Sequence, residues 1–169
     1  MKLFSKIYSE SICILTAAVM LSAMIFTVPR FFGITPYIVL SGSMEPLIQT
    51  GSVAFIDHNR VLPAVGDIIT YETGDLSSPV LVTHRVVKKN SDGSLIMKGD
   101  ANEAPDISAV THDQIIGTYV ASIPKAGYLL SKMNRAEIYI LVGLIILLNV
   151  SSGFLDIIAE ENEEDAESQ

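Results

Sequence analysis

Two long stretches of this 169-residue chain carry no charged side chain, and they constrain the fold more than any other feature. The first covers 19 residues, 11–29, and the second covers 18 residues, 138–155. At about 1.5 Å of rise per residue, either stretch as a helix is roughly as long as the hydrocarbon core of a bilayer is thick. The sequence therefore predicts two transmembrane helices, over residues 11–31 and 136–157.

The charges beside these stretches bear on processing and on orientation. Lys2 and Lys6 precede the first stretch, as in a cleaved signal peptide, but the run is long for one and ends at TVPR without a small-x-small motif. We therefore expect a retained anchor. The same lysines favour a cytoplasmic N-terminus and a middle segment outside, whereas Lys132 and Arg135 favour the opposite. The first segment usually dominates orientation.

The net charge of −8 belongs to the C-terminal tail rather than to the whole chain. Residues 156–169 hold 7 of the 19 acidic residues and no Lys or Arg, which leaves 12 acids against 11 bases elsewhere. We expect residues 158–169 to form an acidic disordered tail. Nothing in this balance indicates nucleic-acid binding. The single cysteine, Cys13, excludes an intramolecular disulfide and a multi-cysteine metal site.

Between the two stretches, short apolar runs alternate with turn-forming residues. The runs are rich in β-branched side chains, and clusters of Gly, Pro, Asn and Asp separate them. We predict strands over residues 37–40, 52–56, 67–71, 79–87, 95–97 and 115–120. Six strands at this spacing indicate a mostly β, antiparallel domain over residues 32–131, flanked by N- and C-terminal transmembrane helices, with a short N-terminal segment at residues 1–10.

The segment 41–46 reads SGSMEP and directly follows the first predicted strand. A serine on such a turn can present its hydroxyl group outside the sheet, where neighbouring backbone N–H groups can face a developing oxyanion. An ordinary turn uses the same residue types. Nothing close in the sequence activates the serine, so a base would have to come from another segment.

Three histidines are candidates for that base. Strand alternation puts His84 in a row with Val82 and Val86, an apolar setting that suits a neutral imidazole acting as a general base. A structural histidine in a core would show the same pattern. His58 and His112 lie in polar turns and are expected at the surface.

A polar segment, residues 98–106 (KGDANEAPD), contains the carboxylates Asp100 and Asp106. Asp100, Asn102 and Asp106 resemble the start of a calcium loop, but the sixth position counted from Asp100 is Pro105 rather than Gly and the twelfth is Thr111 rather than Glu. The segment is then either a polar turn or the source of the carboxylate that orients a histidine in a Ser-His-Asp set.

In this order the motifs resemble those of the type I signal peptidases, most closely the archaeal and endoplasmic-reticulum-like Ser-His subclass. SGSMEP resembles the nucleophile box, THRV (residues 83–86) the segment that carries the base, and GDANEAPD (residues 99–106) the acidic box. GDII at residues 66–69 and the segment from IG at 116–117 to PKAG at 124–127 resemble further strands and the last turn. The resemblance covers residues 37–127 and the preceding anchor.

The resemblance implies a signal-peptidase-like antiparallel β-fold and a membrane-bound serine endopeptidase that removes signal peptides from secreted preproteins after small residues. It implies that Ser43 is the nucleophile, that His84 is the general base and that Asp106 orients the histidine. Ser41 would assist the oxyanion site and Asp100 would be an auxiliary acid, although the choice between the two aspartates stays open. No cofactor and no metal are implied.

The implied partners are preproteins, the lipid bilayer, and a translocation channel or further subunits of a peptidase complex, without nucleic acid. The implied location is the cell membrane, with the catalytic domain on its extracytoplasmic face, or the endoplasmic-reticulum membrane in a eukaryote. Typical bacterial enzymes of the type have a lysine as base. Lys88 lies on the same face of the predicted strand as His84, so a lysine base stays open as the less favoured alternative.

Two other interpretations use the same features differently. A self-cleaving repressor-like serine protease shares the fold but carries a DNA-binding module and a lysine base, whereas this chain has an apolar segment upstream and a histidine. A non-catalytic, membrane-tethered β-domain that binds or scaffolds partner proteins also stays open. It predicts that Ser43→Ala and His84→Ala each leave function intact.

Overall fold

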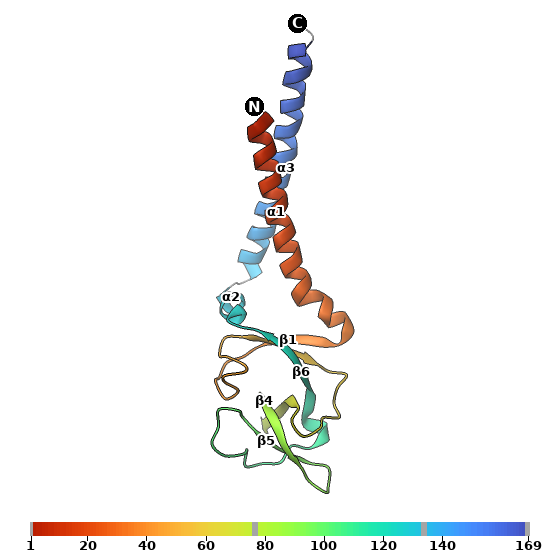
Figure 1. Ribbon diagram of the computed structural model, residues 1–169, viewed down its shortest axis with the longest axis vertical. Coiled ribbons are helices and arrows are strands. Elements are labelled where there is room, and N and C mark those ends of the chain that lie inside the picture. Colours follow the sequence, from red (N-terminus) through yellow and green to blue (C-terminus); the bar gives the residue numbers. More distant parts are fainter. Residues whose placement is uncertain (1, 76–77, 133–134, 168–169) are drawn as a thin grey trace. The chain divides into compact units, whose positions relative to one another are not determined.

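The computed structural model describes residues 2–75, 78–132 and 135–167, and the chain divides into two compact units (Figure 1). One unit contains the long helices from the two ends of the chain, α1 (Lys2–Thr27) and α3 (Arg135–Glu167). The other unit, Val28–Lys132, contains a β-sheet. The predicted arrangement of a β-domain between N- and C-terminal apolar helices is confirmed.

Two helical segments are long and apolar enough to cross a membrane. Leu3–Phe32, which covers most of α1 and continues to the end of η1 (Val28–Phe32), has a mean hydropathy of 2.3, and Ile140–Ala159, within α3, has a mean hydropathy of 2.2. α3 continues to Glu167, whereas we expected residues 158–169 to be disordered. The tail is rich in Glu and contains Ala, both strong helix formers, so it propagates a helix that has already begun.

Polar side chains of α3 contact polar side chains of α1. Asn149 donates a hydrogen bond from Nδ2 to Thr16 Oγ1 at 2.9 Å, and the hydroxyl groups of Tyr8 and Ser151 lie 3.0 Å apart. Ser152 is also buried. In the sequence these α3 residues dilute the second apolar segment. Polar groups paired between helices avoid part of the cost of facing lipid, which explains how an apolar helix tolerates them.

The β-unit is a six-stranded antiparallel sheet with the strand order β1-β2-β6-β3-β4-β5. The strands are β1 (Ile34–Ile38), β2 (Val53–Asp57), β3 (Ile68–Asp75), β4 (Ser78–Lys89), β5 (Leu95–Lys98) and β6 (Ile115–Ile123). Three short helices complete the unit: η1 (Val28–Phe32), η2 (His112–Gln114) and α2 (Ala126–Lys132).

The structure confirms all six predicted strands, but the first lies earlier than residues 37–40. β1 pairs with β2 from Ile34, opposite Asp57, to Ile38, opposite Val53. β1 is an edge strand, which explains why it accommodates Pro36, a residue without an N–H group to donate. The chain therefore leaves the sheet sooner than expected, and the SGSMEP segment lies in the connection between β1 and β2.

Two buried apolar clusters support the sheet, and both lie next to candidate site residues. The smaller cluster contains Met44 and Ile48 from the β1–β2 connection, packed with Ile68 at the start of β3. The larger cluster is built on β3, β4 and β5, and its buried members are Ile69, Tyr71, Val86, Leu95, Met97 and Val110.

β6 lies between β2 and β3 and pairs with both. The sheet thus consists of a β1–β2 hairpin and a β3–β4–β5 meander, which the last strand of the chain joins. Ser43 belongs to the first part, whereas His84 on β4 and Asp106 after β5 belong to the second. The pairing of β6 therefore joins into one sheet the two parts that carry the candidate site residues.

Candidate active site

The turn that carries Ser43 is fixed on both sides by burial and hydrogen bonds. Its neighbours Met44 and Ile48 are 2% and 1% exposed. The Glu45 carboxylate accepts hydrogen bonds from the backbone N–H of Thr50, at 3.2 Å, and from the Thr50 hydroxyl group, at 3.0 Å. Ser43 itself is half-buried, so its hydroxyl group sits on a supported turn and not on a free loop.

The acidic segment packs directly against this turn. The carbonyl oxygen of Ser43 accepts a hydrogen bond from the backbone N–H of Ala101 at 2.9 Å. A Cβ atom at Gly99 would lie only 2.6 Å from the same carbonyl oxygen, so the close approach requires glycine there. The Ser41 and Ser43 hydroxyl oxygens are 3.5 Å apart. The sequence motifs at 41–46 and 99–106 therefore meet in space.

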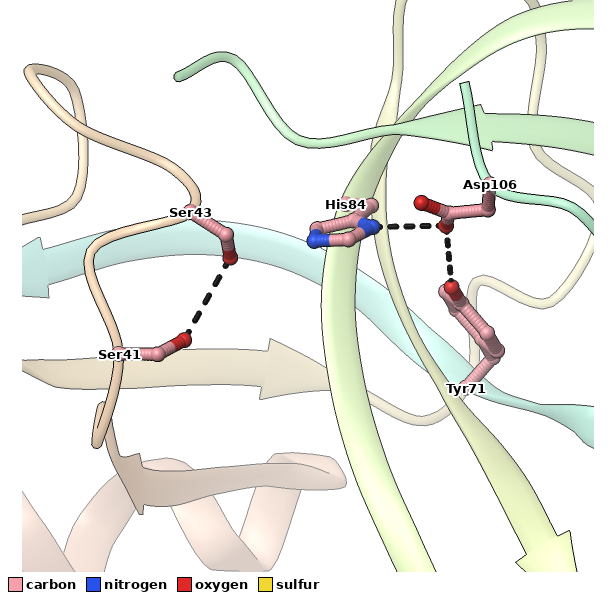
Figure 2. A network of polar contacts seen from close by, with 5 residues as sticks. All are labelled: Ser41, Ser43, Tyr71, His84 and Asp106. Atoms are coloured by element: carbon pink, nitrogen blue, oxygen red, sulfur yellow. Dashed lines mark hydrogen bonds and ion pairs between the residues drawn. The ribbon is translucent and has the colours of Figure 1, made fainter. Parts of the chain in front are cut away.

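His84 lies on β4 opposite Ile69 of β3 and is 7% exposed. Its Nδ1 atom is 2.7 Å from Asp106 Oδ2. Figure 2 shows Ser43 on the side of the imidazole ring away from Asp106, with the second ring nitrogen turned towards it. The Asp106 backbone N–H donates to the carbonyl oxygen of Met97 at 2.8 Å, which fixes the loop that carries the carboxylate.

Tyr71, from β3, is a further member of this network that we did not predict. Its hydroxyl group donates to Asp106 Oδ2 at 2.6 Å, so the same oxygen contacts both Tyr71 and His84 (Figure 2). Burial, and then the hydrogen bond to Asp106, raise the pKa of Tyr71 above its ordinary value. In the sequence Tyr71 was one more apolar strand residue. The available signal was that a buried Tyr normally needs a partner for its hydroxyl group.

Asp100 has a different partner, although it lies in the same acidic segment. Arg85 donates from Nε to Asp100 Oδ1 at 2.8 Å and from Nη2 to Asp100 Oδ2 at 2.6 Å. Its Nη1 donates to the carbonyl oxygen of Gly66 at 2.9 Å. The hydrogen bond to Arg85 holds the pKa of Asp100 below its ordinary value. Asp106, and not Asp100, is therefore the carboxylate against His84.

A cavity of about 710 Å³ adjoins the two serines and His84. Most of its wall is apolar. The lining residues from β1 and the segment after it, and from β4, are Tyr37, Ile38, Val39, Leu40, Pro79, Val80, Leu81 and Val82. An apolar cavity with a few convergent polar groups is the usual form of a site that binds a substrate.

The other candidate bases lie elsewhere. A register shift between Val86 and Lys88 interrupts the alternation of β4, and Lys88 is exposed, so the predicted shared face with His84 does not extend to this lysine. His112 is exposed, as expected. His58 was also expected at the surface, but it is half-buried, with its ring 6.2 Å from that of Tyr37.

Among the residues that the structure describes, no group of three or more His, Cys, Asp or Glu side chains is placed to hold a metal ion. The two carboxylates of the calcium-like segment are engaged by protein groups, Asp100 by Arg85 and Asp106 by His84 and Tyr71. These contacts tie the segment to the sheet.

No protein-family model matches the chain. Individual relatives do define its class, the signal peptidases. The chain is similar to the signal peptidase complex catalytic subunit SEC11 of Eremothecium gossypii, with 36% identity over 124 residues, or 65% of this chain and 73% of the relative. The same subunit of Colletotrichum graminicola is 37% identical over 128 residues (66% and 73%), and that of Candida albicans is 34% identical over 128 residues (69% and 75%).

The chain belongs to the family of these SEC11 catalytic subunits, within the archaeal and endoplasmic-reticulum-like signal peptidases that its motifs resemble.

Proposed function

We propose that this chain is a membrane-bound serine endopeptidase that removes signal peptides from secreted preproteins after small residues. Ser43 is the nucleophile, His84 the general base and Asp106 the carboxylate that orients the base. The observation that carries the proposal is the 2.7 Å contact between His84 Nδ1 and Asp106 Oδ2 beside the supported Ser43 turn. The names of the SEC11 relatives, which are catalytic subunits, support it independently.

The contact with Asp106 sets the tautomer of the base. A carboxylate only accepts hydrogen bonds, so Nδ1 of His84 carries the proton and Nε2 keeps its lone pair. Nε2 takes the proton from the Ser43 hydroxyl group as Oγ attacks the scissile carbonyl carbon. The imidazolium then returns this proton to the leaving amine as the peptide C–N bond breaks. Water hydrolyses the resulting acyl ester through the same base and regenerates Ser43.

Negative charge that develops on the substrate carbonyl oxygen needs donors beside Ser43. The Ser43 backbone N–H and the Ser41 hydroxyl group are the candidates, and the 3.5 Å between the two serine hydroxyl oxygens supports Ser41 in this role. One such donor is worth about 3–4 kcal/mol of transition-state stabilisation. Asp100 acts as an auxiliary residue, because its pair with Arg85 supports the segment that packs against the Ser43 turn.

The walls of the cavity and the apolar helices support the proposed substrate class and location. The apolar residues of β1 and β4 favour uncharged substrate side chains near the scissile bond. The two apolar segments support a place in the cell membrane, or in the endoplasmic-reticulum membrane of a eukaryote, and Lys2 and Lys6 favour a catalytic domain on the extracytoplasmic face. Preproteins, a translocation channel and further subunits are the proposed partners, since the relatives are subunits of a signal peptidase complex.

The proposal is tested by cleavage of a signal-bearing preprotein in membranes that contain the full-length chain. We expect no product from Ser43→Ala and a loss of at least about 10³-fold from His84→Ala, because the nucleophile and its base act as a unit. Activity of the wild type should fall in acid as the His84 imidazole takes up a proton.

Matched control variants are available on the surface of the same domain. Ser91 and His112 are exposed, so Ser91→Ala and His112→Ala should cleave at the wild-type rate. Full cleavage by both Ser43→Ala and His84→Ala would overturn the proposed mechanism, whereas no cleavage by the wild type would favour the non-catalytic, membrane-tethered domain. A rate that rises only in strong alkali would favour a lysine base.

A further inference from the structure

Two hydrogen-bond donors converge on one oxygen atom of Asp106. His84 Nδ1 lies 2.7 Å from Oδ2, and the Tyr71 hydroxyl group lies 2.6 Å from the same atom (Figure 2). The tyrosine and histidine rings are also in contact, edge to face, with their centroids 6.5 Å apart. Asp106 is thus held between a base that must change its charge and a phenol that stays neutral.

The position of Tyr71 follows from the register of β3 and β4. Ile69 is opposite His84 and Tyr71 is opposite Val82, so Tyr71 and His84 are diagonal neighbours on one sheet surface. Tyr71 is 5% exposed and belongs to the larger apolar cluster, which fixes its ring. The donor is therefore part of the rigid sheet.

Asp106, in contrast, lies in the irregular segment between β5 and η2. Its side chain is 20% exposed and lines a second cavity, of about 610 Å³, together with Tyr71 and His84. Its backbone is fixed by one hydrogen bond to Met97. A carboxylate on such a segment needs a side-chain contact to keep one rotamer, and the Tyr71 hydroxyl group supplies a charge-assisted one.

We propose that Tyr71 is a positioning residue for the reaction, which holds Asp106 Oδ2 against His84 Nδ1 and moderates the negative charge that Asp106 presents to the imidazole. The inference rests on the proposed function, because it assigns His84 the role of base. Since the Tyr71 hydroxyl group keeps its proton to well above neutral pH, the contact persists wherever His84 is able to act.

The charged groups around the pair come from several elements. Asp100, paired with Arg85 of β4, also interacts electrostatically with His84 and with Lys98 of β5, and Glu103 lines the second cavity. Replacement of Tyr71 by Phe leaves all of them in place. It removes one hydroxyl group and keeps the ring that packs in the apolar cluster.

The test compares Tyr71→Phe with Tyr119→Phe in the full-length chain. Tyr119 lies on β6, and its hydroxyl group contacts Ser122 Oγ at 3.0 Å, so this control also removes one phenolic hydrogen bond from the sheet. We expect Tyr71→Phe to lower kcat roughly tenfold, as for one lost hydrogen bond to a charged group, with KM within about twofold. Tyr119→Phe should retain the wild-type kcat.

The pH profile separates positioning from structural support. A carboxylate that has lost one donor holds the proton on the imidazole more strongly, and a protonated imidazole is no base. The acid limb of the kcat/KM profile should therefore move to higher pH in Tyr71→Phe and stay in place in Tyr119→Phe. An unmoved acid limb together with a control-like kcat would overturn the inference.

A double-mutant cycle gives a second, independent criterion. In an Asp106→Ala background Tyr71 has no carboxylate to position, so Tyr71→Phe should have no further effect on kcat. Full additivity of the two changes would contradict positioning through Asp106. Ser43→Ala in the same assay keeps the two proposals distinguishable: an active Ser43→Ala refutes the proposed function, whereas an inactive Ser43→Ala with a control-like Tyr71→Phe refutes only the inference.

NMR gives a test that needs no substrate, so it applies even if the chain is inactive in the cleavage assay. The Nδ1 proton of His84, bonded to a carboxylate, should give a resolved low-field NMR resonance in detergent-solubilised protein. We expect it to shift or broaden in Tyr71→Phe and to stay unchanged in Tyr119→Phe. An unchanged resonance in Tyr71→Phe would contradict the inference without any activity measurement.

Discussion

Asp100 and Asp106 lie in the same acidic segment, yet they have different hydrogen-bond partners and therefore a different influence on proton transfer. Asp106 contacts His84 and Tyr71, which come from the neighbouring strands β4 and β3. Asp100 accepts hydrogen bonds from Nε and Nη2 of Arg85, whose side chain is 33% exposed. A carboxylate beside a permanently charged guanidinium has little influence on proton transfer, whereas one beside an imidazole stabilises its charged form.

The role of each aspartate therefore depends on its hydrogen-bond partner. The guanidinium group always carries a charge, so the Asp100–Arg85 pair is a constant link between β4 and the segment that follows β5. The His84–Asp106 pair changes its charge during the proposed reaction. Three substitutions test this division, in order of the effect that we expect.

The largest effect is expected for Asp106→Ala. Without this carboxylate the histidine loses its orientation and the stabilisation of its charged form, so the cleavage rate should fall by about 10³–10⁴-fold. Asp100→Ala is the matched control in the same segment and should lose no more than about tenfold. Preprotein cleavage by both variants in membranes measures this difference. A reversed order of the two losses would show that the partners have been assigned the wrong roles.

An intermediate effect is expected for Gly99→Ala, which disturbs the contact between the acidic segment and the nucleophile turn. The added Cβ would lie 2.6 Å from the Ser43 carbonyl oxygen, so the turn has to move. A displacement of about 1 Å at a reacting group can cost roughly 10²-fold in rate, and we expect a loss of 10- to 100-fold. Preprotein cleavage measures this loss, and the rate of Gly99→Ala is compared with that of a variant in which a glycine elsewhere in the chain is replaced.

Gly153→Ala is the control for this substitution, because a Cβ atom at Gly153 would meet, among the residues that the structure describes, no atom within 4 Å beyond its chain neighbours and the backbone of its own helix. It should cleave at the wild-type rate. Wild-type activity of Gly99→Ala would show that the Ser43 turn tolerates displacement and that the contact with the acidic segment is not needed for cleavage.

The smallest effect is expected for Asp100→Asn, and it concerns stability. Arg85 lowers the pKa of Asp100 in the folded state, so the pair stabilises the fold above the unfolded-state pKa of about 3.9 and loses this contribution as pH falls further. Because the pair is partly exposed, we expect a loss of no more than about 1 kcal/mol at neutral pH.

Denaturant unfolding between pH 2 and pH 7 measures this contribution. The free energies of unfolding of wild type and Asp100→Asn should differ at neutral pH and converge in strong acid, since the wild-type carboxylate is then neutral as well. A difference that stays constant over the whole range would show that the Arg85 pair contributes nothing to stability through its charge.

Much of the fold is predictable because its signals are local. The apolar runs that became β2 to β6 lie within a few residues of the predicted bounds, since β-branched runs between turn clusters are a property of neighbouring residues. The first strand was misplaced because Ile34–Ile38 is defined by its pairing with β2. The strand order was not predictable, since it depends on contacts between residues far apart in sequence.

The candidate site was predictable only where a motif carried it. Ser43, His84 and Asp106 were identified by the resemblance, but their contacts, and the separate pairing of Asp100 with Arg85, needed the structure. Tyr71 was missed because its importance lies in a contact across the sheet, which leaves no mark on a strand that reads as core. The same limit applies to Lys88. Strict alternation along the strand predicts that it shares a face with His84, but a register shift between Val86 and Lys88 interrupts this alternation.

The place of β6 in the sheet has a consequence for the order in which the chain is made. A ribosome delivers the Ser43 turn, then His84, then Asp106, and only afterwards β6 (Ile115–Ile123), the strand that joins the two parts of the sheet. Until that strand has emerged and paired with both β2 and β3, the two parts of the sheet that carry these residues are not joined by strand pairing. Synthesis from the N-terminus thus postpones completion of the sheet until its last strand has emerged.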